Sequence, residues 1–152
     1  MNEKLVIFDS HSHYTDPAFD PDREQLLGSF PEKGVVRCMV CGTQLADSAA
    51  AIALAEQFPQ LIVTACGIHP ECPLPPEDYL DTLRQLSRHP SVKAIGEIGL
   101  DYHFEGYDKA AQQRILREQL TLAKELDLPV ILHCRDAIGD MLQILQIGRA
   151  HV

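Results

Sequence analysis

The alternation of short apolar segments with helical patterns constrains the fold of this chain most. Strand-like segments recur along the sequence at Leu5–Phe8, Val35–Val40, Leu61–Cys66, Val92–Ile95 and Val130–Leu132. Helical patterns lie between them, over Asp22–Phe30, Ala46–Phe58, Pro75–His89 and Asp108–Leu126. Because repeated strand–helix units with short connections form parallel strands with right-handed crossovers, the pattern predicts an α/β fold.

Two α/β architectures fit this alternation: a doubly wound open sheet and a (β/α)8 barrel. A nucleotide-binding open sheet should carry a glycine-rich phosphate turn after its first strand. The corresponding stretch here, "DSHSHYTD", contains no glycine. The sequence therefore favours the barrel, in which reactive residues lie at the C-terminal ends of several strands.

Composition and charge narrow the class of protein. The chain has 152 residues, of which 45% are hydrophobic and 23% charged, which is enough for one ordinary domain with its own core. Its apolar runs are too short for a membrane span or a secretory signal, so we predict a cytoplasmic protein without a membrane partner. The net charge of −9 argues against a passive nucleic-acid-binding module. It leaves room for an enzyme whose bound cations meet phosphates.

The cysteines point to a reduced protein. Their number, five, is odd, and their spacing gives no disulfide framework. Cys38 and Cys41 form a C-x2-C pair inside the apolar run "VVRCMVCGT". In a strand these two side chains point to opposite faces, so we predict core cysteines rather than a metal site.

Residues of the kinds that bind metals follow four of the strand candidates. His11 and His13 are two residues apart, so in an extended chain both imidazoles lie on one face and can reach a single ion. The others come after the third, fourth and fifth strands: His69; Glu97 and Asp101; His133 and Arg135. Each has an ordinary explanation, such as a solvated loop histidine, a turn residue or a surface arginine. Their shared position at the strand ends favours one common site.

The chemistry of such a site follows from its ligands. Imidazole and carboxylate ligands suit zinc and other transition metals better than calcium. Two ions held about 3.5–4 Å apart need a bridging group, and the carboxylate of Glu97 is the candidate. His11 and His13 would hold one ion and His133 the other, and each ion would activate water. Arg135 could present its guanidinium to a phosphate.

Four ordered segments, "FDSHSH", "GIHP", "GEIGLDY" and "LPVILHCRDA", resemble the signature segments of the TatD family of metal-dependent deoxyribonucleases, within the amidohydrolase-like TIM-barrel superfamily. The resemblance implies a distorted (β/α)8 barrel, two divalent ions (Zn, Mg or Mn) and hydrolysis of DNA, often exonucleolytic. It implies His11 and His13 as ligands of the first metal and His133 of the second. Glu97, with water on the metals, is the implied bridging and catalytic residue. His69 and Arg135 match positions that face substrate.

The resemblance also implies that elements are missing. Such proteins continue with further strand–helix units that supply another metal-binding histidine and a late aspartate, whereas no strand candidate follows Leu145. We therefore expect residues 1–146 to form the N-terminal part of an incomplete TIM-like barrel, five of eight strands, that is inactive by itself. The last six residues, "IGRAHV" (147–152), read like a translated sequencing adapter and are predicted to be a non-native tail.

Two other functions stay open. One is an amidohydrolase that cleaves a C–N bond, although many of those carry a lysine at the end of the fourth strand, where this chain has Glu97. The other is a metal-binding or scaffold protein without catalysis, which is disfavoured because the ligands line a rim rather than a closed cage. DNA is the predicted substrate, and no protein partner is predicted.

Overall fold

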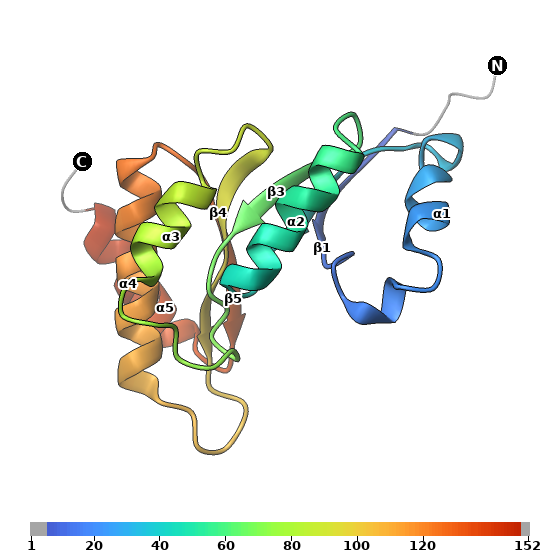
Figure 1. Cartoon of the computed structure of the whole chain (residues 1–152). Helices are drawn as coiled ribbons and strands as arrows, with labels where there is room; N and C mark the ends of the chain where they lie inside the picture. Colours follow the sequence, from blue (N-terminus) through green and yellow to red (C-terminus); the bar gives the residue numbers. More distant parts are fainter. Residues whose placement is uncertain (1–5, 150–152) are drawn as a thin grey trace.

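The computed structural model describes residues 6–149 and contains one parallel sheet (Figure 1). Its strands are β1 (Ile7–Ser12), β2 (Val35–Cys41), β3 (Ile62–Cys66), β4 (Val92–Asp101) and β5 (Val130–Arg135). They pair in chain order, and every neighbouring pair is parallel. A doubly wound sheet reverses its strand order, whereas a (β/α)8 barrel does not. The predicted α/β fold with barrel-type topology is confirmed.

Helices connect the strands and cover the sheet. They are α1 (Arg23–Gly28), α2 (Leu45–Gln57), α3 (Tyr79–Leu86), α4 (Lys109–Glu125) and α5 (Ile138–Arg149), with short 3-10 turns at Pro17–Phe19 and Pro31–Lys33. In Figure 1, α1 lies beside β1 at one end of the sheet, and α3, α4 and α5 gather at the other end. None of the helices within residues 6–149 is long and apolar enough to cross a membrane.

The core lies on both faces of the sheet. One large cluster joins β3 and β4 to α3, α4 and α5, with Leu83, Ile98 and Leu116 fully buried. A second cluster packs β2 and β3 against α1 and α2. Cys38 belongs to this second cluster, whereas Cys41 belongs to a small one on the opposite face. Both cysteines are fully buried, so the prediction of core cysteines is confirmed.

Several predicted element boundaries are wrong. Strand β4 does not end at Ile95 but runs to Asp101, because the glycine-containing segment "GEIGLD" pairs with β5 and is buried. Strand β5 extends to Arg135 rather than ending at Leu132, and β1 continues to Ser12. Helix α3 begins at Tyr79, after the prolines that were included in the predicted helix. Helix α5 was not predicted.

The two ends of the sheet match the predicted incomplete barrel. Within residues 6–149, β1 and β5 have a strand neighbour on one side only. The side chains of Phe8 on β1 and Leu132 on β5 are exposed. The predicted tail begins inside α5, and residues 150–152 lie outside the described part of the chain. Its non-native origin therefore stays a prediction.

Gly99 lies where β4 pairs with β5, opposite His133. A Cβ atom at Gly99 would collide with the backbone carbonyl of His133. We expect Gly99→Ala to lower the free energy of unfolding by about 1–3 kcal/mol, as overpacking does, and to displace His133. Urea denaturation of the complete gene product (the whole protein that the gene encodes, including whatever flanks residues 1–152) measures this.

Gly139 on α5 provides the matched control for this substitution. A Cβ atom at Gly139 would have no neighbour within 4 Å, and alanine favours a helix, so Gly139→Ala should keep or slightly raise the stability. Equal stabilities of the two alanine variants would show that β4 and β5 do not approach each other as described.

Candidate active site

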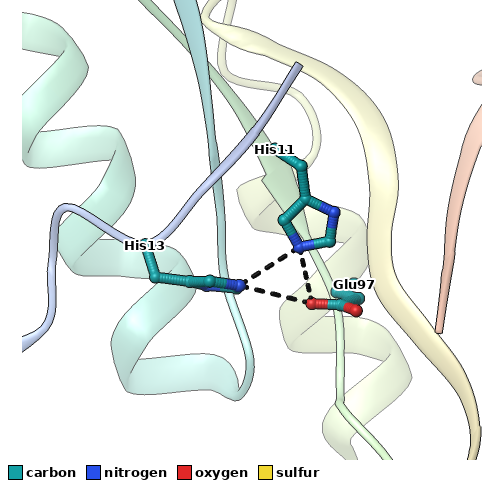
Figure 2. A group of neighbouring side chains, drawn as sticks. All are labelled: His11, His13 and Glu97. Atoms are coloured by element: carbon teal, nitrogen blue, oxygen red, sulfur yellow. Dashed lines mark hydrogen bonds and ion pairs between the residues drawn. The ribbon is translucent and has the colours of Figure 1, made fainter. Parts of the chain in front are cut away.

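The H-x-H pair at the end of β1 meets a carboxylate from the middle of β4 (Figure 2). Since β1 remains extended through Ser12, His11 and His13 project to the same side, as predicted. Their Nε2 atoms lie 3.1 Å apart. Oε2 of Glu97 lies 2.9 Å from Nε2 of His11 and 3.4 Å from Nε2 of His13. Residues 86 positions apart in the sequence thus share one cluster.

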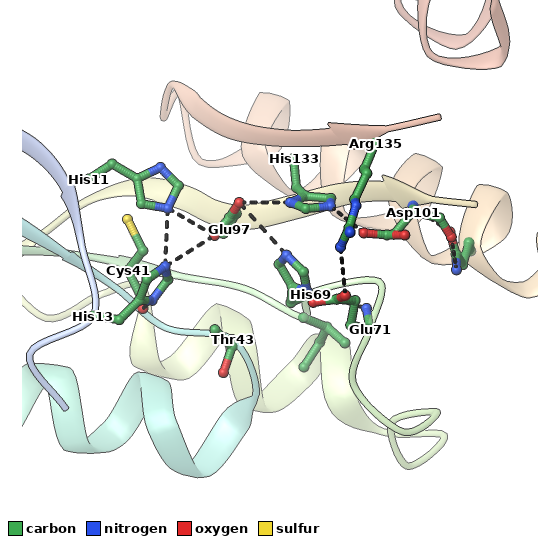
Figure 3. Close-up of polar contacts among 12 residues, drawn as sticks. His11, His13, Cys41, Thr43, His69, Glu71, Glu97, Asp101, His133 and Arg135 are labelled. Carbon is green, nitrogen blue, oxygen red and sulfur yellow. Dashed lines mark hydrogen bonds and ion pairs between the residues drawn. The ribbon is translucent and has the colours of Figure 1, made fainter. Parts of the chain in front are cut away.

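The second oxygen of Glu97 faces a different pair of imidazoles (Figure 3). Oε1 lies 3.2 Å from Nδ1 of His133, at the end of β5, and 3.7 Å from Nε2 of His69, which follows β3. The rings of His69 and His133 pack edge to face, with their centroids 4.3 Å apart. Glu97 therefore stands between two pairs of histidines and turns one oxygen toward each.

These residues form two groups with the donors that a divalent ion requires. His11, His13 and Glu97 offer donor atoms within 4.8 Å of one another, and so do His69, Glu97 and His133. Imidazole nitrogen and carboxylate oxygen are ligands that zinc and similar divalent metals accept. A ligand that bridges two ions must belong to both groups, and the carboxylate of Glu97 does. The residues present therefore fit divalent metal ions.

Electrostatics keep Glu97 negative. Only 7% of its side chain is exposed, and burial by itself would raise the pKa of the carboxyl group. Hydrogen bonds from His13 and His11 and the nearby His69 outweigh burial and lower the pKa to about 2. In return, the hydrogen bond to Glu97 raises the pKa of His13 against the opposing effect of burial. Glu97 is thus ionised at neutral pH and attracts cations.

Backbone and carboxylate partners orient two of the imidazoles. Nδ1 of His13 lies 3.0 Å from the carbonyl oxygen of Cys41, which can only accept, so Nδ1 donates and Nε2 is left for a metal. Nε2 of His133 lies 2.8 Å from Oδ2 of Asp101. Burial raises the pKa of Asp101, but hydrogen bonds from the His103 amide and from His133 produce a net lowering. His133 therefore donates from Nε2 and turns Nδ1 toward Glu97.

The sequence places Asp101 among the residues at the strand ends but assigns it no role in the site. Its position at the end of the fourth strand was the signal for it, but the sequence could not show that it contacts His133. Loss of a carboxylate that orients a metal-binding histidine lowers the metal affinity by about 10- to 100-fold. We expect Asp101→Asn to weaken metal binding by about that factor.

Titration of the complete gene product with Zn²⁺ or Mn²⁺ measures the effect of Asp101→Asn. Asp81→Asn is the control, since Asp81 is an exposed carboxylate on α3 outside both donor groups. An unchanged metal affinity in Asp101→Asn would remove Asp101 from the orienting role.

Of the two residues predicted to face substrate, His69 belongs to the second donor group and Arg135 lies outside both groups. Arg135 contacts Glu71, with 3.7 Å between Nη1 and Oε1, and is not among the residues that contact Glu97. The backbone amide of Glu71 donates to Nδ1 of His69 over 3.2 Å. Because an amide N–H only donates, Nδ1 of His69 accepts, and the neutral ring carries its proton on Nε2. Burial, together with His133, lowers the pKa of His69 and so keeps this ring neutral.

The chain is similar to known proteins over most of its length. The sequence model of the family described as "TatD related DNase" matches residues 8–151. The "Uncharacterized metal-dependent hydrolase YabD" of Bacillus subtilis is 36% identical over 142 residues, which are 93% of this chain and 55% of that protein. The "3'-5' ssDNA/RNA exonuclease TatD" of Erwinia tasmaniensis is 36% identical over 141 residues, 92% of this chain and 54% of that protein.

Solved structures show the same fold. The crystal structure of YJJV, a TatD homolog from Escherichia coli, matches with a TM-score of 0.85 and 36% identity, over 93% of this chain and 55% of that one. A TatD family hydrolase from Entamoeba histolytica matches with a TM-score of 0.83 and 25% identity, over 97% and 56%. The chain spans about half the length of the relatives it matches. The family model covers nearly all of it, and the chain therefore belongs to the TatD-related DNase family.

Proposed function

We propose that the complete gene product is a metal-dependent hydrolase that cleaves phosphodiester bonds in DNA, as an exonuclease. The observation that carries the proposal is Glu97, ionised and placed between two pairs of imidazoles. The printed names of the relatives, a metal-dependent hydrolase and ssDNA/RNA exonucleases, support the reaction class. The inactivity of residues 1–152 by themselves stays a prediction.

Four residues would bind the two ions. His11 and His13 would bind one ion through Nε2, His133 would bind the other through Nδ1, and Glu97 would bind both. When bound, such ions polarise a phosphoryl oxygen and lower the pKa of coordinated water. We propose two ions, of Zn, Mg or Mn. The negative charge of Glu97 would hold two cations close together.

The protonation of His69 supports a contact with substrate rather than a bond to metal. Its Nδ1 accepts from the Glu71 amide, so its Nε2 carries the proton that a metal ligand would have to lose. That N–H faces the space beside Glu97, where it can donate a hydrogen bond to a phosphate oxygen. We therefore propose His69 as a substrate-binding residue.

Arg135 is proposed to bind a phosphate further along the strand. The guanidinium is partly exposed at the end of β5, two residues beyond His133. Its contact with Glu71 holds it near the rim, and a planar guanidinium pairs well with a phosphate. Glu71 thus positions both proposed substrate contacts, His69 through its amide and Arg135 through its carboxylate.

Metal binding by His11, His13 and Glu97 is expected to weaken as the pH falls from about 8 to about 5.5, across the range in which histidines titrate. Because the pKa of His13 is raised, the His13 ring of the metal-free protein stays protonated up to a higher pH than a free histidine does. A metal needs the neutral ring and must displace that proton, so below this pKa the affinity falls by up to about tenfold per pH unit. Glu97, with a pKa of about 2, stays ionised throughout.

Titration calorimetry in two buffers of different ionisation enthalpy tests this pH dependence. It should show both the loss of affinity and the release of protons on binding. A metal affinity that does not change across this pH range would contradict the proposed ligand set.

A nuclease assay tests the proposed function itself. The complete gene product is treated with chelator, dialysed, and given a 5′-labelled single-stranded DNA with Mg²⁺, Mn²⁺, Zn²⁺ or no metal. We expect cleavage only with metal, and products that shorten from one end. A panel of cyclic amides and ureas is tested in parallel. Hydrolysis of a C–N bond with no cleavage of DNA would replace the proposal with the amidohydrolase alternative.

A further inference from the structure

A pocket opens beside the donor groups, between the loop after β3 and the loop that joins β4 to α4. Its volume is about 520 Å³, within the range of small-ligand pockets. His69 and Asp101 line it, and the same two residues contact Glu97 and His133. The pocket is therefore continuous with the candidate active site.

Two aromatic rings form part of the wall of this pocket. Phe104 and Tyr107, on the loop between β4 and α4, are 56% and 41% exposed. Each ring already has a partner on one face. Tyr107 stacks on Tyr102 with 4.7 Å between centroids and 8° between planes, and the guanidinium of Arg135 lies 5.0 Å from the centroid of Phe104. A flat group that enters the pocket meets rings that are already held in place.

The loop that carries these rings is fixed at both ends. At its start, the side chain of Gln112 bonds both backbone groups of Asp101, each over 2.8 Å. At its end, Oδ1 of Asp108 accepts from the amide of Ala111 and caps α4. The loop therefore presents Phe104 and Tyr107 at a defined place beside the donor groups.

The negative charges that line the pocket favour the base of a nucleotide over its phosphate. Glu71, Glu105 and Asp108 all line it, and carboxylates repel a phosphate. A nucleobase is uncharged and has flat faces that stack on aromatic rings. Its N–H groups can donate hydrogen bonds to carboxylates. The pocket thus fits a base, whereas the phosphates would be bound by Arg135, by the Nε2–H of His69 at the pocket's edge and by the metal ions.

We propose that this pocket binds one unpaired nucleobase of the nucleic acid whose phosphodiester lies at the metal centre. The inference rests on the proposed function and names the part of the substrate that is recognised. Because stacking accepts any base, the pocket does not select a sequence. It favours single-stranded substrates, because a base in a duplex is already stacked and paired and cannot enter.

The test combines changes in the pocket with changes in the substrate. A series of single-stranded oligonucleotides each carries one abasic residue, at a different position from the cleaved end. With the wild-type complete gene product, one position should lower kcat/KM by about 10- to 100-fold, the usual effect of one lost stacking contact. Phe104→Ala with Tyr107→Ala should lower kcat/KM on the intact strand by a similar factor, and should abolish the penalty of the abasic residue.

Controls separate stacking from general damage. Tyr107→Phe keeps the ring and should therefore keep the abasic penalty that the double alanine variant loses. Leu142→Ala removes an exposed apolar side chain on α5, outside the pocket, and should change nothing. An abasic penalty of the same size in the wild type and the double variant, or no penalty at any position, would overturn the proposal.

Binding measurements keep the test independent of the reaction. Fluorescence anisotropy with the same oligonucleotides in the presence of chelator needs no turnover. If no DNA is cleaved but the abasic penalty on binding depends on Phe104 and Tyr107, the base pocket stands and the proposed reaction fails. Cleavage of DNA with no such dependence in either measurement leaves the proposed reaction in place and removes the pocket.

Discussion

Glu97→Gln is expected to lower the nuclease activity of the complete gene product by about a thousandfold or more. The neutral amide keeps the shape of the side chain but removes the charge that faces both donor groups. At about 4 Å and an effective dielectric constant near 20, one charge pair is worth about 4 kcal/mol, which corresponds to about a thousandfold. Metal content should fall together with activity, whereas the fold should survive. Metal analysis and kcat/KM on single-stranded DNA measure the two effects.

Glu56→Gln is the control for this substitution. Glu56 is an exposed carboxylate on α2, and its removal should change neither metal content nor turnover. Two bound ions per protein in Glu97→Gln, at wild-type affinity, would exclude Glu97 as the bridge. Loss of activity with full metal content would indicate a role in the reaction other than holding the ions.

His11→Ala combined with His13→Ala should abolish metal-dependent cleavage under chelator-treated conditions. The double substitution removes two of the three donors of the first group and leaves Glu97 as its only ligand. We expect activity to fall by about a thousandfold or more, because the loss removes the electrostatic stabilisation that a bound ion supplies. Activity should not be recovered at a millimolar concentration of metal.

His89→Ala is the matched control, since His89 lies in the turn after α3, outside both donor groups. It should keep the activity and the metal content of the wild type. Wild-type turnover in the double variant, after removal of trace metal, would show that the imidazoles of the first strand are not ligands.

The parts of the fold that could be predicted depend on local patterns. The five strands follow from short apolar runs and four of the helices from helical patterns, and the residue predicted to open the last of these helices, Asp108, is the N-cap of α4. The end of β4 could not be found in this way, because glycines disfavour a strand by themselves. Here Gly96 and Gly99 lie in the strand because β5 packs closely against them, which is a tertiary effect.

In the candidate site, too, some features follow from local sequence patterns and others depend on tertiary contacts. His11 and His13 come from one extended segment, so their common face follows from the two-residue period of a strand. The strand-end rule of barrels predicts that Glu97 and His133 meet, and they do, but Glu97 lies within β4 and not after its end. The role of Asp101 depends on its contact with His133, 32 residues away, and no local pattern encodes that contact. The protonation of His69 depends on a backbone amide, which leaves no mark in the sequence.

Anomalous diffraction tests the central claim, that Glu97 joins two metal ions, most directly. Crystals of the complete gene product grown with Mn²⁺ are measured at the manganese absorption edge. We predict two anomalous peaks about 3.5–4 Å apart, the separation typical of two-metal sites, one beside His11 and His13 and the other beside His133, with one oxygen of Glu97 bound to each. A single peak, or two peaks of which only one contacts Glu97, would contradict the account.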